Sequence, residues 1–283
     1  MSQPKVQVVI PVYNSAKYIR RCLDSLCSQT YTNWEALIID DASLDNSVEI
    51  VKKYLTFDNR FTLIENEINQ GVSKVRNLAL DKLSGEFTAF LDSDDYWESD
   101  MLETMVNKAL AGDFDVVQCR FLYDYPGGRQ VLPAGAFDKD IELAKDDMKP
   151  VYFKMATGIN MNHVCMKLIR SELIKDIRFD VGLKTAEDLQ FCIRMFCKVK
   201  KYCFINKALY HYCRNSESIT GKGMSGKEKL KANIRVSSDM VKALPEWGID
   251  TLFWRTLCTT RPYIIIVSKV LRIFNEKIFS KNK

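Results

Sequence analysis

The stretch FTAFLDSDD, residues 87–95, passes directly from apolar side chains to carboxylates. Residues 87–91 have the length and composition of a short buried strand, and Asp92-Ser93-Asp94-Asp95 closes it. The same step occurs earlier in the chain, where the apolar run 34–39 ends at Asp40-Asp41. Two strands that end in acidic residues predict a sheet whose polar loops gather at one edge.

Outward from this stretch, strand and helix patterns alternate through the first half of the chain. This alternation, with short connections, predicts an α/β fold with a mostly parallel, doubly wound central sheet flanked by helices. Ligands of such sheets bind outside the carboxyl ends of the strands, where both acidic clusters fall. The expected strands are 6–11, 34–39, 61–64, 87–91 and 113–118, and the expected helices are 16–29, 46–54, 72–83 and 100–110.

From Tyr123 onward the pattern is irregular. A polar, loop-like segment is expected at 137–149, a strand at 163–170, a helix at 187–198, two short strands within 202–212 and a helix at 225–243.

Composition sets broad limits on the class of protein. The chain has 283 residues, a formal net charge of +5 and nine cysteines, with no Cys-x-x-Cys pair. The charge is too small and too scattered to indicate nucleic-acid binding, and the cysteines are expected to be reduced, buried thiols. The N-terminus has no signal-peptide pattern, and no apolar run approaches the about 20 residues that span a bilayer. A cytoplasmic location is therefore expected.

Two common nucleotide-binding motifs do not fit. The turn Pro11-Val12-Tyr13-Asn14 lacks the glycines of a dinucleotide fold. The segment Gly221–Glu228 resembles a P-loop, but Glu228 replaces the required Ser or Thr and no strand precedes it.

The acidic clusters have two interpretations each. Asp92-x-Asp94 is suited to bridge a divalent cation to a diphosphate, or its residues cap the following helix. Asp41 is placed to accept a hydrogen bond from a nucleobase, whereas Asp45 is interpreted as a helix cap. Glu187-Asp188 opens a predicted helix, where carboxylates are favoured for electrostatic reasons alone.

Taken in order, these segments resemble the family 2 glycosyltransferases, which have the Rossmann-like GT-A fold. The resemblance covers about residues 5–220. The matching segments are Val8–Asn14, Ile38–Asp45, Asn69–Asn77, Phe90–Asp95 and Glu187–Phe191, with weaker matches at Lys167–Arg170, Tyr210–Arg214 and Ser218–Thr220. Ala42 stands where the family often has Gly, and His211, where it often has Tyr, is interpreted as a strand histidine rather than a metal ligand.

The resemblance implies inverting sugar transfer from a nucleoside-diphosphate sugar, most commonly a UDP-sugar, to a hydroxyl of a glycan or lipid-linked acceptor in cell-surface polysaccharide synthesis. It implies Asp188 as the catalytic base, a Mn²⁺ or Mg²⁺ ion at Asp94 and Asp95, and Glu187 and Arg214 as contacts of the acceptor or the diphosphate. The implied donor-nucleotide contacts are Pro11, Tyr13, Asn14, Asp41, Arg76, Asp92, Ser93 and Asp94.

The implied organisation is a GT-A domain over 1–220, with a donor-binding half at 1–122 and an acceptor half at 123–220. A helical C-terminal extension follows at 221–283. Its segment 221–226 is interpreted either as a lid over the donor or as a plain connection. Residues 262–283 have a basic amphipathic pattern, which favours contact with an anionic membrane over packing on the domain.

Two other functions remain open from the sequence. A sugar nucleotidyltransferase also combines an α/β sheet with metal-binding carboxylates, although it usually has a Gly-rich basic loop after the first strand. The other is a non-catalytic protein that binds nucleotide sugars or glycans.

Overall fold

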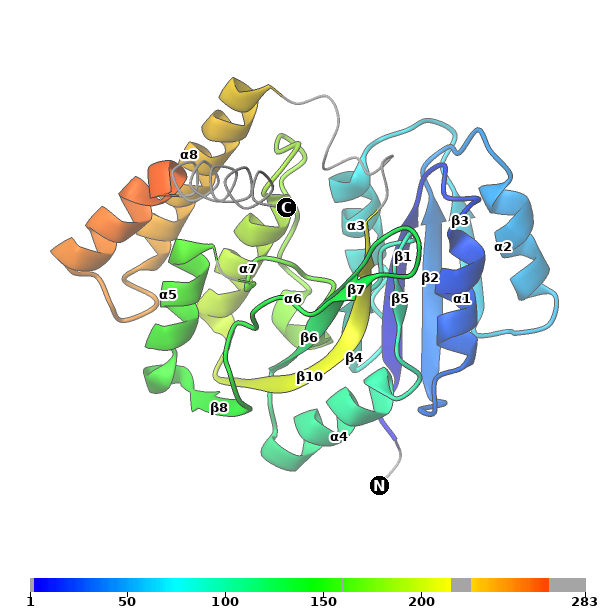
Figure 1. Cartoon of the computed structure of the whole chain (residues 1–283), viewed down its shortest axis with the longest axis horizontal. Coiled ribbons are helices and arrows are strands. Elements are labelled where there is room, and N and C mark those ends of the chain that lie inside the picture. Colours follow the sequence, from blue (N-terminus) through cyan, green and yellow to red (C-terminus); the bar gives the residue numbers. More distant parts are fainter. Residues whose placement is uncertain (1–2, 159, 215–224, 265–283) are drawn as a thin grey trace, which may run out of the picture.

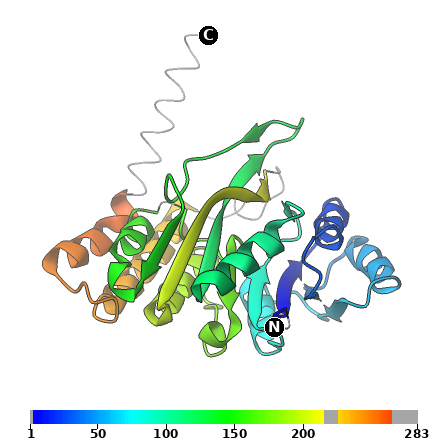
Figure 2. The same ribbon diagram turned by 90° about the horizontal axis from the view of Figure 1, so that it is seen from below.

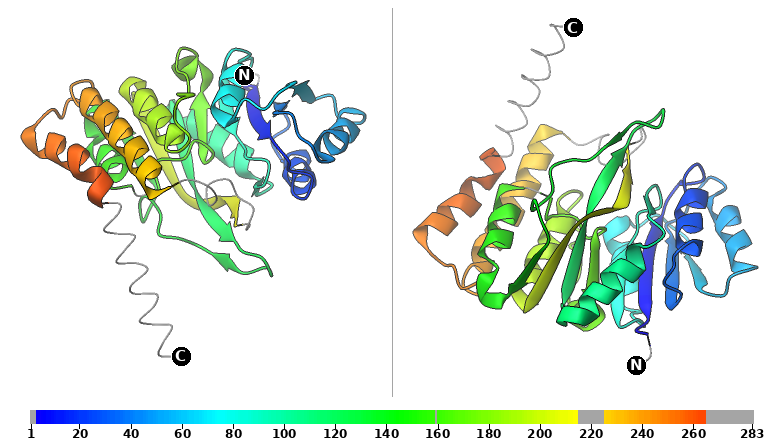
Figure 3. Two further views of the ribbon diagram at one scale, coloured as in Figure 1. Left: turned by 90° about the horizontal axis from the view of Figure 1, so that it is seen from above. Right: turned by 60° about the horizontal axis from the view of Figure 1, so that its bottom comes forward.

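A computed structural model describes residues 3–158, 160–214 and 225–264. Its strands form one sheet in the order β3-β2-β1-β4-β9-β6-β10-β5, with β7 paired to β6 and β8 to β10. Helices α1 and α2 cover one face and α3 and α7 the other (Figures 1 and 3). The strands are β1 Val6–Val12, β2 Trp34–Asp40, β3 Phe61–Glu65, β4 Phe87–Phe90, β5 Tyr96–Trp97, β6 Val116–Asp124, β7 Gln130–Val131, β8 Ile141–Ala144, β9 Lys167–Arg170 and β10 Lys201–Cys213.

The first half of the chain confirms the predicted alternation. Strands β1 to β4 lie within about two residues of their predicted ranges, and β1 pairs in parallel with both β2 and β4. The α/β fold is therefore as predicted, and the loops after β1, β2 and β4 share one edge of the sheet. The helices of this half are α1 Ile19–Cys27, α2 Ser47–Leu55, α3 Val72–Leu80 and α4 Met101–Gly112.

The second half is more ordered than the sequence predicts. β10 is a single strand with bulges between Phe204 and Tyr210, where two short strands were expected. The expected loop at 137–149 contains β8, and β9 lies antiparallel between β4 and β6. The remaining labelled helices are α5 Lys149–Thr157, α6 Ser171–Ile174, α7 Glu187–Lys198 and α8 Gly226–Ala243, with a short 3₁₀ turn at Lys145–Asp147. The described residues 252–264 are also helical.

The hairpin formed by β6 and β7 stands out from the body of the molecule (Figure 2). Its antiparallel pairing sets Tyr123 opposite Val131 and Asp124 opposite Gln130. The turn is closed by hydrogen bonds from Tyr125 N to Arg129 O at 2.9 Å and from Gly128 N to Tyr125 O at 3.2 Å.

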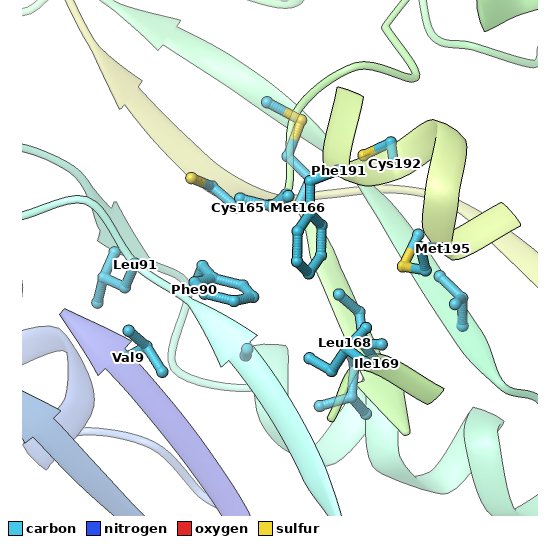
Figure 4. Close-up of a cluster of buried hydrophobic side chains, with 14 of the residues drawn as sticks. Val9, Phe90, Leu91, Cys165, Met166, Leu168, Ile169, Phe191, Cys192 and Met195 are labelled. Atoms are coloured by element: carbon cyan, nitrogen blue, oxygen red, sulfur yellow. The ribbon is translucent and has the colours of Figure 1, made fainter. Parts of the chain in front are cut away.

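One continuous hydrophobic core joins the two halves (Figure 4). The ring of Phe191 on α7 stacks on Phe179 at 4.2 Å and meets Phe90 of β4 edge-on at 6.2 Å. This packing fixes the N-terminal end of α7 against the central strands. All nine cysteines are free and most are buried, as the sequence predicts.

Helix α8, the first helix after residues 215–224, packs against the preceding domain. α8 begins with a capping box between Ser225 and Glu228. These two residues of the P-loop-like segment therefore form the start of a helix. Gln190 of α7 donates a 2.6 Å hydrogen bond to Asp239 of α8. Within the described ranges, no helix is long and apolar enough to cross a bilayer.

Candidate active site

Loops after β1 and β2 are tied together at the carboxyl edge of the sheet. Asn14 has a positive φ of 48°, its backbone N–H donates to Ser43 Oγ at 2.9 Å, and its Oδ1 accepts from Leu44 N at 2.8 Å. Ala42 has a φ of 61°, a conformation that favours glycine, which gives a backbone reason for the family's Gly at this position. Next to this junction, Pro11 is partly buried in β1 and Tyr13 is 38% exposed.

Asp41 is buried directly after β2, and its carboxylate organises the loop before α3. It accepts hydrogen bonds from Gly71 N at 2.7 Å, Gln70 N at 2.9 Å and Asn66 Nδ2 at 2.9 Å. Each of its oxygens therefore already has a partner within the protein. Asp41 therefore holds the loop that leads into α3. Asp45 accepts from Ser47 N at 3.0 Å and from Ala16 N at 2.9 Å, whereas the N-cap position of α2 is occupied by Asn46, so Asp45 joins two loops just before the helix and is not its N-cap residue.

The loop after β4 carries the predicted metal and ribose contacts. Ser93 is buried, and its hydroxyl lies 2.6 Å from that of Ser15, which joins this loop to the one after β1. The backbone carbonyl of Asp94 accepts from Arg21 at 3.0 Å, and the Asp94 residue is partly exposed. Arg21 is on α1, and no motif in the sequence marks it as part of this region.

Asp95 points inward from the same loop. Its carboxylate accepts from Tyr210 Oη at 2.5 Å and from Cys213 N at 2.8 Å, and the residue is 1% exposed. Burial first, and then the neighbouring carboxylates of Asp94 and Asp92, raise the pKa of Asp95 well above its usual value. Asp95 thus anchors the acidic loop to the end of β10.

Arg76 brings distant carboxylates together. From α3, its guanidinium donates to Asp188 at 2.7 Å and to Asp92 at 2.9 Å, and it lies 3.8 Å from Glu187. Burial lowers the pKa of this buried group, but Asp188 and Asp92 outweigh that effect and hold it well above its usual value. Arg76 is therefore a permanent buried cation between the acidic loop and α7.

Glu187 and Asp188 form the first turn of α7. The second carboxylate oxygen of Asp188 accepts from Val164 N at 3.3 Å. Burial, and then the charge of Asp188, raise the pKa of Glu187 to about 7, although Arg76 opposes this. Two adjacent carboxyl groups therefore differ in their surroundings: Asp188 is held by a cation, and Glu187 keeps its proton until near neutral pH.

The segment before β9 supplies neighbours that sequence reasoning missed. Cys165 Sγ lies 3.1 Å from Asp92 Oδ2. Burial first, and then the charge of Asp92, raise the pKa of the Cys165 thiol. Lys167, buried in β9, donates to the backbone carbonyls of Met161 and His163. Burial lowers the pKa of both His163 and Lys167. The sequence signals for this region were the strand pattern at 163–170 and the Lys167–Arg170 match to the family, and neither marked these side chains.

His211 is a strand histidine, as interpreted. It is buried in β10, where its ring stacks on Tyr96 at 4.1 Å. Its two nitrogens lie 2.8 Å from Glu98 and 3.2 Å from Asp124. Each ring nitrogen therefore lies near a carboxylate, that of Glu98 directly after β5 or that of Asp124 at the end of β6.

The predicted site residues thus fall into one region with distinct parts. Asp92, Glu187 and Asp188 surround Arg76, while Asp41 holds the loop that leads into α3. Arg214 follows β10, with its side chain over the rings of Tyr123 and Tyr212. No group of three or more potential metal ligands was found in the described part of the chain. Residues 221–224 of the proposed lid segment lie outside the described residues.

The chain is similar to known proteins in sequence and in structure. The model of the family "Glycosyl transferase family 2" matches residues 7–178. The chain is 42% identical over 236 residues to the uncharacterized glycosyltransferase YibD of Escherichia coli, covering 81% of this chain and 67% of that one. It is 33% identical to the glycosyltransferase GlyA of Streptococcus pneumoniae, covering 74% of this chain but spanning only 30% of GlyA.

Among solved structures, the chain is similar to residues 1–349 of Staphylococcus aureus TarS in complex with UDP-GlcNAc. The TM-score is 0.71 at 26% identity, covering 86% of this chain and 71% of TarS 1–349. The fold is accordingly GT-A. With the family match over more than half of its length, the chain belongs to glycosyl transferase family 2.

Proposed function

We propose that this protein is an inverting glycosyltransferase that moves a sugar from a nucleoside-diphosphate donor, with a UDP-sugar favoured, to a hydroxyl of a glycan or lipid-linked acceptor in cell-surface polysaccharide synthesis. Family membership and the likeness to TarS, which was solved with UDP-GlcNAc, support the donor class. The observation that carries the proposal is Arg76, which holds Asp92 and Asp188 together at the edge where ligands of such sheets bind.

We assign the donor nucleotide to the loops after β1, β2 and β4. Pro11, Tyr13 and Asn14 would line the nucleoside, beside the loop that Asp41 holds. Asp92, Ser93 and Asp94 would face the ribose and diphosphate. The hydrogen bonds that join Asn14 to Leu44 and Ser93 to Ser15 support a preformed site, because they lock the three loops to one another.

The residues present fit a divalent cation held jointly with the donor. Mg²⁺ and Mn²⁺ are commonly bound by one or two carboxylates together with phosphate oxygens, so a complete protein cage is unnecessary. Asp94, partly exposed in the acidic loop, is the proposed ligand, with Asp92 beside it. Asp95, paired with Tyr210 and Cys213, is proposed to position that loop. When bound, the ion would offset negative charge on the leaving diphosphate.

Asp188 is the proposed catalytic base. The acceptor hydroxyl gives its proton to the Asp188 carboxylate as its oxygen bonds to the anomeric carbon. The bond from that carbon to the diphosphate oxygen breaks on the opposite face, the electron pair leaves with the nucleoside diphosphate, and the configuration inverts. Arg76 and the Val164 N–H orient the carboxylate for this step.

Membrane contact is a separate part of the proposal. The basic amphipathic pattern of residues 262–283 supports peripheral binding at the cytoplasmic face of the membrane, although residues 265–283 lie outside the described ranges. Leu252 and Phe253 of the preceding helical segment are 82% and 61% exposed.

The test of function is release of nucleoside diphosphate from a panel of UDP-, GDP- and dTDP-sugars, with and without glycan acceptors. A transferase releases the diphosphate faster when the correct acceptor is present. Pyrophosphate release from UTP and sugar 1-phosphates would instead indicate a nucleotidyltransferase. Binding of a nucleotide sugar with no turnover on any acceptor would indicate the non-catalytic alternative.

A further inference from the structure

A row of rings runs from the proposed catalytic base onto the projecting hairpin of β6 and β7. The row begins at His163, which adjoins Val164, the residue whose N–H contacts Asp188. The His163 ring lies 6.5 Å from that of Phe121, and Phe121 meets Tyr123 edge-on at 4.9 Å. We call this row, completed by Tyr212 and Tyr125, the aromatic strip.

The outer part of the strip joins two strands. Tyr123 of β6 lies opposite Tyr212 of β10, with ring centroids 5.7 Å apart, and Tyr125 follows at 6.3 Å from Tyr123. All three tyrosines are only partly buried. Their rings and hydroxyls therefore offer both apolar and hydrogen-bonding surface, the combination that suits a sugar ring.

Two guanidinium groups lie on the faces of these rings. Arg214 lies over Tyr123 at 4.5 Å and over Tyr212 at 5.6 Å, and Arg129 lies over Tyr125 at 4.3 Å. Both arginines are exposed. Stacking fixes the plane of each guanidinium and leaves its N–H edge for an anion.

The hairpin holds Arg129 in a defined place. The hydrogen bonds from Tyr125 N to Arg129 O and from Gly128 N to Tyr125 O close its turn, and Gly127 and Gly128 have φ values of 84° and 82°, which suit glycine. The backbone N–H of Arg214 donates to Asp124 O at 2.7 Å, which ties the end of β10 to the same hairpin. Arg129 therefore lies in a hydrogen-bonded turn, and Arg214 directly follows β10.

Phe121 is buried, so the accessible surface of the aromatic strip is its outer part, formed by Tyr123, Tyr125 and Tyr212. We propose that this outer part binds the acceptor and selects a saccharide that carries anionic groups, either phosphate or carboxylate. This inference rests on the proposed glycosyl transfer and names its acceptor class. The donor loops follow β1, β2 and β4, whereas the strip lies on β6 and β10, across β9 from them. If one hydroxyl of the acceptor lies at Asp188, the rest of the saccharide extends along the strip. There its anionic groups contact the guanidinium groups of Arg129 and Arg214.

The test is direct binding of matched saccharide pairs, without donor, by isothermal titration calorimetry. One pair is tetragalacturonate and its neutral methyl ester, and the other is phosphorylated pentamannose and its dephosphorylated form. We expect a charged member to bind about tenfold more tightly than its neutral partner, and Arg129→Gln and Arg214→Gln each to lose about tenfold for the charged member alone. Lys53→Gln, which removes a positive charge from α2 beside the opposite edge strand β3, is the control and should bind as the wild type does.

The proposal is overturned if charged and neutral members of both pairs bind equally, if none binds, or if Arg129→Gln keeps wild-type affinity. Which pair shows the effect identifies phosphate or carboxylate. Arg129 is on an exposed turn, so its variant should fold normally. A parallel thermal-shift measurement with UDP and Mn²⁺ distinguishes a failure of the strip proposal from a failure of the proposed donor chemistry. If UDP stabilises the protein but the titrations fail, the strip is wrong; if UDP gives no shift, the proposed donor chemistry fails independently.

Discussion

The guanidinium of Arg76 donates a 2.7 Å hydrogen bond to the carboxylate of Asp188, which lies 112 residues later in the chain. A second nitrogen of the same group donates to Asp92 at 2.9 Å. The acidic loop after β4 and the first turn of α7 are therefore held by one buried cation. This contact joins the two halves of the proposed site, and most predictions below depend on it.

Replacement of Asp188 by Asn should remove turnover but not donor binding. Asn keeps the volume and can still accept a hydrogen bond from Arg76, but it cannot take a proton from the acceptor. We expect a loss of about 10³-fold or more in kcat, as is usual for a general base. UDP affinity, measured by calorimetry with Mn²⁺, should change by no more than about twofold. Weakened UDP binding with normal turnover would refute the assignment.

Arg76→Met should destabilise the fold strongly. The substitution leaves Asp92, Glu187 and Asp188 facing one another without their shared cation. Removal of one partner from such a buried pair costs about 3 kcal/mol or more in free energy of unfolding, which urea denaturation at pH 7 would measure.

The matched control for that variant is Arg178→Met. Arg178 forms a 2.6 Å ion pair with Asp81, with 40% and 57% of the two side chains exposed. Exposed pairs contribute about 0–1 kcal/mol. Equal losses in the two variants would show that Arg76 is no more important to the fold than a surface arginine.

The stability of the ligand-free protein should respond to Glu187 between pH 4.5 and 7. Burial and the charge of Asp188 raise the pKa of Glu187 from 4.5 to about 7. Over that window the folded protein keeps a proton that the unfolded chain has lost, so this group's contribution to stability falls as pH rises. Glu187→Gln cannot ionise and should gain up to about 3 kcal/mol relative to wild type between pH 5 and pH 8.

Urea denaturation of both proteins at the two pH values measures this gain. The exposed Glu67 provides the control, because Glu67→Gln should differ from the wild type by the same amount at both pH values. A Glu187→Gln variant with no relative gain at pH 8 would show that Glu187 ionises normally in the folded protein.

The C-terminal segment should carry any membrane affinity. A chain that ends after Ile264 retains Arg261, which is buried and donates a 2.9 Å hydrogen bond to Asn233 of α8. We expect the full chain, but not this shorter one, to float with vesicles rich in phosphatidylglycerol, and high salt to reduce flotation. Flotation of both chains alike would assign the affinity to another surface.

The sequence predicted the fold of the first half of the chain well because its signals are local. The β-branched runs of β1 and β2 and the carboxylates that end them mark both the strands and the edge of the sheet where their loops gather. In the second half the signals are weaker. Asn206 and Lys207 interrupt the apolar pattern of β10, so that one bulged strand was predicted as two. The helix α5 was missed, although Val151, Tyr152, Met155 and Ala156 are buried at helical spacing.

At the candidate site, the sequence indicated which loops gather at one edge of the sheet, but not the partner of each side chain. Asp41 and Asp95 fit the pattern of ligand contacts, yet their carboxylates are turned onto Gly71 N and Cys213 N. The direction of a side chain depends on packing between distant segments, which the local pattern does not contain. The same holds for Lys167, whose hydrogen bonds hold the segment before β9.

The central claim is that a nucleoside diphosphate and a divalent cation bind together at the acidic loop. Its most direct test is the melting temperature of the wild type and of Asp94→Asn with UDP, with Mn²⁺, and with both. We predict that UDP and Mn²⁺ together stabilise the wild type by about 2.7 kcal/mol at a hundredfold excess over Kd, with little effect of either alone and little response in Asp94→Asn. An unchanged melting temperature with every nucleoside diphosphate, in the presence of Mn²⁺ or Mg²⁺, would contradict the account.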